Sequence, residues 1–377
     1  MKQTAFLIFF SIVLLIYGLI NFYIFRRTVG LAGAWKNIYA LVFWLLVIMY
    51  PAGRILERQA ASWISDVMIW TGSFWLAVMV YAFLWVLLFD IIRLITFFYP
   101  SFKIWLSGVN PPLRLLVGFF LVFLPVVAGY INANHPRLKY LELRAPIARP
   151  IRITFLSDIH LGTTAGKAKV QRITELVTDS KPDIVIFGGD VLDEDVGQVL
   201  RKRIGFELLH IKAPLGVFAV TGNHEYIGGA SQAISFLKSN GIRLLMDEWV
   251  LVDSALVIAG RKDRDGARFG GGKRKTVDEL TKGIPQGFPV VLIDHQPFEI
   301  TEKTNSPVFL NLSGHTHHGQ LWPLHLITRA VYEKSYGYMS RSGSHFYISC
   351  GAGTWGPPIR TTSRPEVVVI DLIPQDR

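Results

Sequence analysis

Five short apolar runs in the C-terminal half of the chain each end in residues that bind metal ions well. The runs are rich in β-branched and aromatic residues and have the length of strands. They lie at residues 151–156, 183–187, 216–220, 289–293 and 308–312. In an α/β sheet, side chains just beyond the carboxyl ends of neighbouring strands meet in one crevice. These runs therefore predict an α/β fold with a single polar site.

The residues that follow the runs are carboxylates, an amide and imidazoles. They are Asp158 and His160; Asp190 and Asp193; Asn223, His224 and Glu225; Asp294 and His295; and His315, His317 and His318. Carboxylate oxygen, amide oxygen and imidazole nitrogen are the ligands of hard and borderline divalent cations. A pair of such cations, about 3.5–4 Å apart, needs a bridging carboxylate. No hydrophobic core needs so many of these groups in one place, so the pattern predicts a metal centre, with Asp190 as the candidate bridge.

The N-terminal part of the chain is apolar and basic. Residues 1–150 carry 13 Lys and Arg against 4 Asp and Glu, a net charge of +9, whereas residues 151–377 carry a net charge of only +2. Basic residues that flank apolar segments are typical of membrane proteins, so the overall charge does not indicate a nucleic-acid partner. The single cysteine, Cys350, excludes an internal disulfide.

Four segments approach the roughly 20 apolar residues that are needed to cross a bilayer. They lie at about residues 5–25, 38–49 with their flanks, 67–89 and 115–131. The second is the weakest, because Pro51, Gly53 and Arg54 interrupt it. Arg26 and Arg27 follow the first segment, where a secretory signal would have a small-residue cleavage site. We therefore expect an all-α transmembrane region of about four helices at residues 1–133, with the lipid bilayer as its partner.

Residues 134–150 contain Pro136, Pro146 and Pro150 and are expected to form a linker that leaves the membrane. In the expected catalytic domain, residues 151–377, strands alternate with helical patterns. The helical patterns lie at residues 167–178, 199–211 and 230–239, and a strand pair is expected at 249–260. Residues 260–275 are rich in Gly, Lys and Arg and are expected to form a mobile loop. Its charges could bind an anionic headgroup or simply be solvated.

The order of these motifs resembles that of the calcineurin-like metallophosphoesterases, over about residues 155–372. The pieces read SDIHLG, GGDVLD, TGNHEY, DHQP and SGHTHHGQ. Each piece is weak alone, but their combination in this order is very specific. The resemblance implies a four-layer α/β/β/α sandwich with two divalent metal ions, Mn, Fe or Zn, at the carboxyl ends of the strands. The apolar N-terminal region is similar to that of the membrane-anchored bacterial branch of the family.

Carried over residue by residue, the resemblance implies two ligand sets that share Asp190. The first set is Asp158, His160, Asp190 and His317, and the second is Asp190, Asn223, His295 and His315. His224 matches the histidine that protonates the leaving group or contacts the phosphate. Asp193, Glu225 and Asp294 are expected to support the ligands from behind. His318, where related sequences often have Gly, is expected at the rim or in contact with substrate.

These residues predict a membrane-bound phosphoesterase in which a metal-activated hydroxide attacks phosphorus. Phosphate monoesters and diesters are both compatible with the pattern, and a phospholipid or lipid-linked substrate would suit a site held near headgroups. The alternative is a non-catalytic sensor or scaffold that binds metal or nucleotide, but such a protein should have lost Asp190 or His224. A transporter with an accessory domain is disfavoured, because the spans have few polar residues and no inverted repeat.

The loops between the four expected spans bear on the orientation of the chain. Loops one and three carry six basic residues, whereas the N-terminus and loop two carry three. The positive-inside rule then places the catalytic domain outside the cytoplasm. The linker adds four basic residues to the other side, so the count becomes six in loops one and three against seven on the other side. We expect a multi-pass protein of the bacterial cell membrane with an extracytoplasmic catalytic domain.

Overall fold

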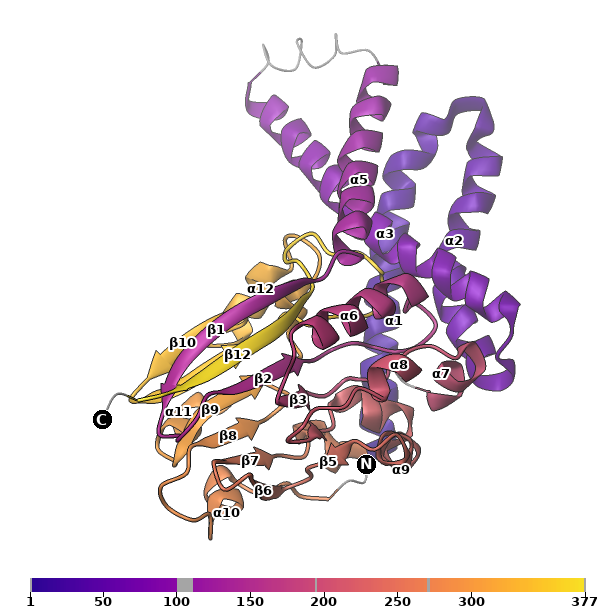
Figure 1. Ribbon diagram of the computed structural model, residues 1–377. Helices are drawn as coiled ribbons and strands as arrows, with labels where there is room; N and C mark the ends of the chain where they lie inside the picture. Colours follow the sequence, from indigo (N-terminus) through magenta and orange to yellow (C-terminus); the bar gives the residue numbers. More distant parts are fainter. Residues whose placement is uncertain (1, 100–110, 194, 270–271, 376–377) are drawn as a thin grey trace. The chain divides into compact units, whose positions relative to one another are not determined.

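The computed structural model describes residues 2–99, 111–193, 195–269 and 272–375. The chain divides into two compact units, Met1–Tyr130 and Ile131–Arg377 (Figure 1). We call the first the helical unit and the second the catalytic unit, and we describe each by itself.

The helical unit consists of long apolar helices. Three described stretches are long and apolar enough to cross a membrane, namely Ser11–Ala60, Trp63–Phe98 and Leu116–Ala133. The first stretch holds two helices, so that each of the four expected spans falls within a helix. The elements are α1 (Lys2–Thr28), the 3₁₀ segment η1 (Val29–Trp35), α2 (Lys36–Ala60), α3 (Trp63–Phe98) and α5 (Pro111–Ala133), whose last residues belong to the catalytic unit.

Two glycines explain why α2 is a full-length helix despite the breakers in its sequence. A Cβ atom on Gly72 of α3 would lie 2.3 Å from the backbone nitrogen of Tyr50, and one on Gly53 of α2 would lie 2.9 Å from Cβ of Met68. Helices in membranes pack closely where small residues meet. The two backbones therefore approach each other over Pro51, and this packing offsets the hydrogen bond that proline cannot make.

The catalytic unit contains two six-stranded sheets. Their strand orders are β1-β12-β2-β3-β4-β5 and β10-β11-β9-β8-β7-β6. The strands of the first sheet are β1 (Arg137–Ala145), β2 (Ile151–Leu156), β3 (Ile184–Phe187), β4 (Val217–Ala219), β5 (Arg243–Leu244) and β12 (Glu366–Pro374). Those of the second are β6 (Glu248–Val252), β7 (Leu256–Gly260), β8 (Val290–Ile293), β9 (Val308–Ser313), β10 (Gly337–Arg341) and β11 (Ser344–Ile348).

The helices of this unit are α6 (Lys167–Asp179), α7 (Val196–Lys202), α8 (Phe206–Leu209), α9 (Asn223–Ser239), α10 (Val277–Thr281), α11 (Ile300–Thr304) and α12 (His325–Val331), with 3₁₀ turns η2 (Arg264–Phe269) and η3 (His317–Gly319). Those from α6 to α11 cover the outer faces of the sheets. Strand β3 shows how the layers form. Val185 and Phe187 pack under α6–α9, whereas Ile184 and Ile186 pack against the second sheet. Because successive strand residues point to opposite faces, one apolar strand serves both cores. A third core joins the second sheet to α10, which confirms the expected α/β/β/α layers.

The strand directions bring the functional loops to one edge. Strands β2, β3 and β4 are parallel to one another, as are β7, β8 and β9. Strand β12 is antiparallel to β2 and parallel to β1, so β1 and β12 begin at the edge where β2 ends. The chain therefore enters the catalytic unit at the edge that carries the predicted site.

Three local differences from the sequence expectations stand out. Residues 137–145, within the expected linker, form strand β1, which pairs with β12 over nine residues. The helical pattern at 199–211 is broken into α7 and α8, because Arg203 and Gly205 take a left-handed backbone. The helix expected at 230–239 is present, but a kink at Gly229, where φ is 116°, joins it to an earlier helical segment. Together they form α9, which begins at Asn223 and carries Asn223 and His224 in its first turn.

Candidate metal centre

The predicted ligands come from five loops at one edge of the sandwich. Asp158 and His160 follow β2, Asp190 follows β3, Asn223 begins α9 after β4, His295 follows β8, and His315 and His317 follow β9. Asp158, His160, Asp190 and His295 are at most 1% exposed. Buried carboxylates and imidazoles in such number are costly unless they compensate one another or bind a cation.

Three overlapping groups have potential ligand atoms within 4.8 Å of one another. They are Asp158, His160 and His317; His160, Asp190 and His224; and Asp190, His295 and His315. The first and third correspond to the two predicted ligand sets. Asn223 joins the third, because its Oδ1 lies 2.9 Å from Nδ1 of His315. The second group shares Asp190 with the third, so this carboxylate lies between the two halves of the cluster.

The distances between these side chains suit ligands of shared cations. Nε2 of His160 lies 3.0 Å from Nε2 of His317, and Nε2 of His295 lies 3.1 Å from Oδ2 of Asp190. Two ligands at right angles and about 2.1 Å from one ion are about 3 Å apart. Nε2 of His295 is buried, and Oδ2 of Asp190, at 3.1 Å, is its neighbour rather than a hydrogen-bond partner of good geometry. A cation between this nitrogen and the carboxylate would fit both groups.

The backbone of these loops is strained, and this strained conformation brings the potential ligands close together. Five residues of these loops have φ between 46° and 71°, namely Asp158, His160, Asp190, His315 and His317. Residues other than glycine seldom adopt this left-handed backbone. Neighbouring glycines allow the close approach. A Cβ on Gly222 would lie 2.1 Å from Oδ1 of Asp190, and one on Gly314 would lie 2.2 Å from Oδ2 of Asp158. Strain of this kind gathers at functional sites.

Burial and neighbouring charges set the protonation of the cluster. Burial lowers the pKa of His315 to about 4 and lowers the pKa of His317 well below its usual value. Both rings are therefore neutral at pH 7, as a metal ligand must be. For His295, burial opposes the charged form, but the carboxylates of Asp190, Asp158 and Asp263 together outweigh it and raise the pKa well above the usual value. A cation at His295 must displace that proton, so acid is expected to weaken binding.

Two of the predicted supporting residues, Glu225 and Asp193, contact the loops and rings that carry the potential ligands. Glu225 is fully buried and accepts hydrogen bonds from the backbone N–H groups of Asp190, Leu192 and Gly222. It thereby ties the loop after β3 to the start of α9. Oδ1 of Asp193 lies 3.5 Å from Nδ1 of His160, and its backbone oxygen accepts from Nδ1 of His224. These contacts orient the loop and the two rings.

His318 lies deeper than its expected place at the rim. Its side chain is buried, with Nδ1 3.3 Å from Oγ of Ser335 and its ring 5.2 Å from that of Tyr336. Burial lowers its pKa to about 4. The side chain therefore packs as a neutral ring against Ser335 and Tyr336.

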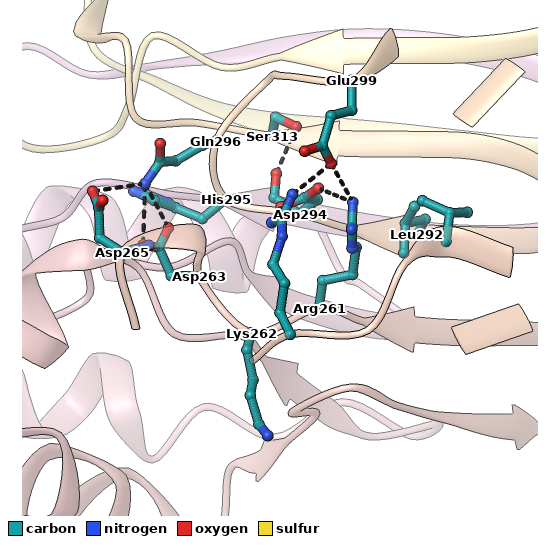
Figure 2. A network of polar contacts seen from close by, with 12 residues as sticks. Arg261, Lys262, Asp263, Asp265, Leu292, Asp294, His295, Gln296, Glu299 and Ser313 are labelled. Carbon is teal, nitrogen blue, oxygen red and sulfur yellow. Dashed lines mark hydrogen bonds and ion pairs between the residues drawn. The ribbon is translucent and has the colours of Figure 1, made fainter. Parts of the chain in front are cut away.

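Asp294, beside the potential ligand His295, lies in a buried ion cluster (Figure 2). Its carboxylate accepts from Arg261 and Arg274 at 3.1 and 3.0 Å and lies 3.0 Å from Nζ of Lys303. Glu299 accepts from the same two arginines. Burial alone would raise the pKa of Asp294, but the three cations outweigh it and hold that pKa well below the usual range.

This cluster corrects the expectation of an open basic loop at residues 260–275. Arg261 is only 2% exposed, and Arg274 is hydrogen-bonded to Asp294 and Glu299. Lys275 donates to the backbone oxygen of Asp247. The charges of Arg261 and Arg274 are used inside the protein, because the buried Asp294 needs compensation. Arg261 and Arg274 are thus not available to capture an anionic headgroup.

Replacing Asp294 with asparagine should destabilise the catalytic unit. The change keeps the shape but leaves buried cations without their counter-charge, which typically costs about 3–5 kcal/mol. Because the folded pKa is depressed, the charge of Asp294 stabilises the protein above the unfolded pKa of about 3.9 and stops doing so only as pH falls through the lower folded value. Thermal unfolding of the full chain in detergent at pH 7 measures the effect.

Asp371→Asn is the matched control for this prediction. Asp371 accepts from Nε of Arg152 at 2.7 Å, in a pair whose side chains are 29% and 38% exposed. A surface pair of this kind is worth about 0–1 kcal/mol. Equal shifts in the unfolding temperature for the two variants would show that the charge of Asp294 stabilises the protein no more than that of a surface ion pair.

Arg360 is a residue of the site to which the sequence pattern assigned no role. It is fully buried, and its Nη2 lies 3.0 Å from Nδ1 of His317. The same guanidinium donates to the backbone oxygens of Gly353 and Cys350. It therefore fixes the ring of a potential ligand from the C-terminal tail. Only its position in the sequence GPPIR, within the region of resemblance, hinted at this function.

Comparison with known proteins agrees with this site. The family model described as calcineurin-like phosphoesterase matches residues 151–319. An uncharacterised metallophosphoesterase of Aquifex aeolicus is 36% identical over 233 residues, which cover 61% of this chain and 87% of that protein. An uncharacterised metallophosphoesterase of Campylobacter jejuni is 27% identical over 376 residues, covering 97% of this chain and 98% of that one.

Some relatives also carry membrane regions. A zebrafish protein named transmembrane protein with metallophosphoesterase domain is 32% identical over 264 residues, which cover 65% of this chain and 60% of that protein. The family model spans all five motif loops, from Asp158 to His317. The chain belongs to the calcineurin-like metallophosphoesterase family.

Proposed function

We propose that this chain is a membrane-bound, binuclear-metal phosphoesterase that hydrolyses phosphate monoesters or diesters, with a phospholipid or lipid-linked phosphoester as its substrate. One observation carries the proposal: two groups of buried potential ligands meet at Asp190. The residues that would hold one ion are Asp158, His160, Asp190 and His317. Those that would hold the other are Asp190, Asn223, His295 and His315. Mn, Fe and Zn all suit this mixture of oxygen and nitrogen donors.

When bound, two such cations activate a water molecule and stabilise the charge that develops on the phosphoryl oxygens. The protein residues position these groups and move protons. Nδ1 of His224 is held by the backbone oxygen of Asp193, which leaves Nε2 to give a proton to the leaving oxygen. The backbone N–H of His224 donates to Oδ1 of Asp190 at 2.9 Å, so the proton donor and the shared carboxylate are fixed relative to each other.

A hydrolysis panel on the purified full chain, loaded with Mn²⁺, tests this function. The panel should hold an aryl phosphate monoester, an aryl phosphate diester, a nucleotide and a phospholipid, each with and without a chelator. Turnover that depends on the metal and favours one class supports a phosphoesterase and names its substrate. Bound metal without turnover of any substrate would instead favour the sensor or scaffold.

We also propose that the protein crosses the membrane several times and exposes its catalytic unit outside the cytoplasm. The support is the basic loops between the spans and three described apolar stretches of sufficient length. A cysteine at the exposed residue Gln286 can be tested, because the native Cys350 is fully buried. Labelling of that cysteine by a membrane-impermeant maleimide on intact cells supports the proposed side. Labelling only after lysis would place the unit in the cytoplasm.

A further inference from the structure

The catalytic unit carries an apolar surface that none of its described parts covers. It is formed by Trp322, Leu326, Ile327 and Val331, which are 54%, 58%, 60% and 56% exposed. We call these four residues the α12 surface. Helix α12 itself contains no buried residue. Exposed neighbouring apolar residues of this size usually mark a binding surface.

The α12 surface adjoins the metal centre. Gln320, three residues after His317, donates to the backbone oxygen of Trp355 at 2.8 Å and accepts from its N–H at 3.0 Å. The ring of Trp355 is 53% exposed, and its centre lies 5.8 Å from that of His224. The segment that begins with the ligand loop thus continues through Gln320 into the α12 surface, and Trp355 adds an apolar edge beside His224.

The same surface adjoins the place where the chain arrives from an apolar helix. The stretch Leu116–Ala133 is long enough to cross a membrane, and its last turn belongs to the catalytic unit. Nδ2 of Asn132 donates to the backbone oxygens of Arg360 and Ser363, both at 2.9 Å. The N–H of Trp322 donates to Oγ1 of Thr361 at 2.8 Å. One short loop therefore binds both the end of the apolar helix and the start of the α12 surface.

The sheet topology agrees with this placement. Strand β1 starts at Arg137, four residues after that helix ends, and four residues can reach at most about 14 Å. It begins at the edge where β2 ends and where the metal ligands gather. Figure 1 shows α12 at the same end of the unit as the start of β1. The potential ligands, the apolar surface and the end of the helix thus share one side of the catalytic unit.

We propose that the α12 surface docks on the bilayer that holds this helix, so that the metal centre opens onto lipid headgroups and takes a phosphoester carried at the membrane surface. The chemistry of the surface fits a lipid interface, where tryptophan is favoured and apolar side chains enter the acyl boundary. Helix α12 has an exposed Arg329 in its last turn and no acidic residue, so it also suits anionic headgroups. The choice of substrate rests on the proposed function, whereas the docking does not.

Fluorescence quenching by lipids tests the docking directly. The full chain carrying Ile327→Cys, labelled with an environment-sensitive dye, is placed in nanodiscs of phosphatidylethanolamine and phosphatidylglycerol. The native Cys350 is fully buried, so the new thiol is labelled selectively. Docking predicts a blue-shifted emission that lipids with a nitroxide on the acyl chain quench. Gln286→Cys, at the exposed turn before β8 and thus at the opposite edge, should show neither effect.

Other outcomes would overturn the docking. A blue shift without quenching by the nitroxide lipid would mean that protein, either a second copy of the chain or the helical unit, covers the α12 surface. Emission like that of the Gln286 label would mean that the surface lies in water. The emission shift and the quenching can both be measured whether or not the protein hydrolyses any substrate.

The consequence for the substrate is tested with Leu326→Glu together with Ile327→Glu. Loss of one fully buried apolar side chain is worth about tenfold or more in affinity. The apparent KM for phospholipid in vesicles of the same composition should therefore rise at least about tenfold. kcat for a water-soluble aryl phosphate should stay unchanged. The control Gln286→Glu should change neither the KM for phospholipid nor the kcat for the aryl phosphate. Equal losses on both substrates would defeat the role in substrate capture, whereas a wild-type protein inactive on all phosphoesters would defeat the proposed function instead.

Discussion

Replacing Asp190 with alanine is expected to remove both metal ions and reduce hydrolysis to background. Oδ2 of Asp190 lies 3.1 Å from Nε2 of His295 and 3.9 Å from Nε2 of His160, which belong to different predicted ligand sets. Without this carboxylate, each set loses its shared anionic ligand. The remaining charge of Asp158 cannot balance two dications in a site that is almost fully buried. Elemental analysis of the purified protein should fall from two ions per chain to none.

Asp183→Asn is a useful control for this variant, because Asp183 and Asp190 stand at opposite ends of strand β3. Oδ2 of Asp183 accepts from the backbone N–H of Arg152 at 2.8 Å, at the end of β3 away from the cluster. The control should keep both ions and full activity. Asp190→Ala also removes the acceptor of the His224 N–H, so the unfolding temperature must be measured for each variant without metal. A folded Asp190→Ala protein that retains two ions would refute the shared carboxylate.

Much of the catalytic unit could be predicted from short-range patterns. The runs before the ligand loops correspond to β2, β3, β4, β8 and β9, with bounds shifted by at most a residue or two. Their apolar residues divide between the core that joins the two sheets and a core under the helices, and each strand is short and buried on both faces. A short run that is apolar on both faces fits few structures other than a strand buried between two layers. The ligands could be named for the same reason, since each follows a strand whose direction is fixed by the parallel pairing.

Features that depend on contacts between distant residues were not visible in the sequence. Strand β1 looked like a linker because of its flanking prolines, and its partner β12 lies more than 220 residues away. Arg261 and Arg274 looked like solvated charges, because only the fold brings them to Asp294. Arg360 had no motif of its own, and its contact with His317 spans 43 residues. Burial of a charge depends on the neighbours that compensate it, and local composition does not encode them.

Replacing His224 with alanine is expected to leave both metal ions in place and lower kcat by about 10²–10⁴-fold, the usual contribution of a positioned acid. The structure adds a second possible role, because a ring nitrogen of His224 lies within 4.8 Å of potential ligand atoms of His160 and Asp190. His224 could therefore be a ligand rather than a proton donor. Nδ1 of His224 is engaged by the backbone oxygen of Asp193. This contact orients the ring and is compatible with both roles.

Metal content and leaving-group dependence together decide between the roles. A proton donor matters most when the leaving oxygen is a poor leaving group, so an alkyl phosphoester should lose far more activity than a nitrophenyl ester. His224→Asn can keep a donor toward Asp193 but cannot transfer a proton, and it should be as impaired as the alanine variant. His210→Ala, at an exposed position after α8, should behave as wild type. Loss of one ion in His224→Ala would make His224 a ligand, and equal losses on both esters would show that it positions the phosphate instead.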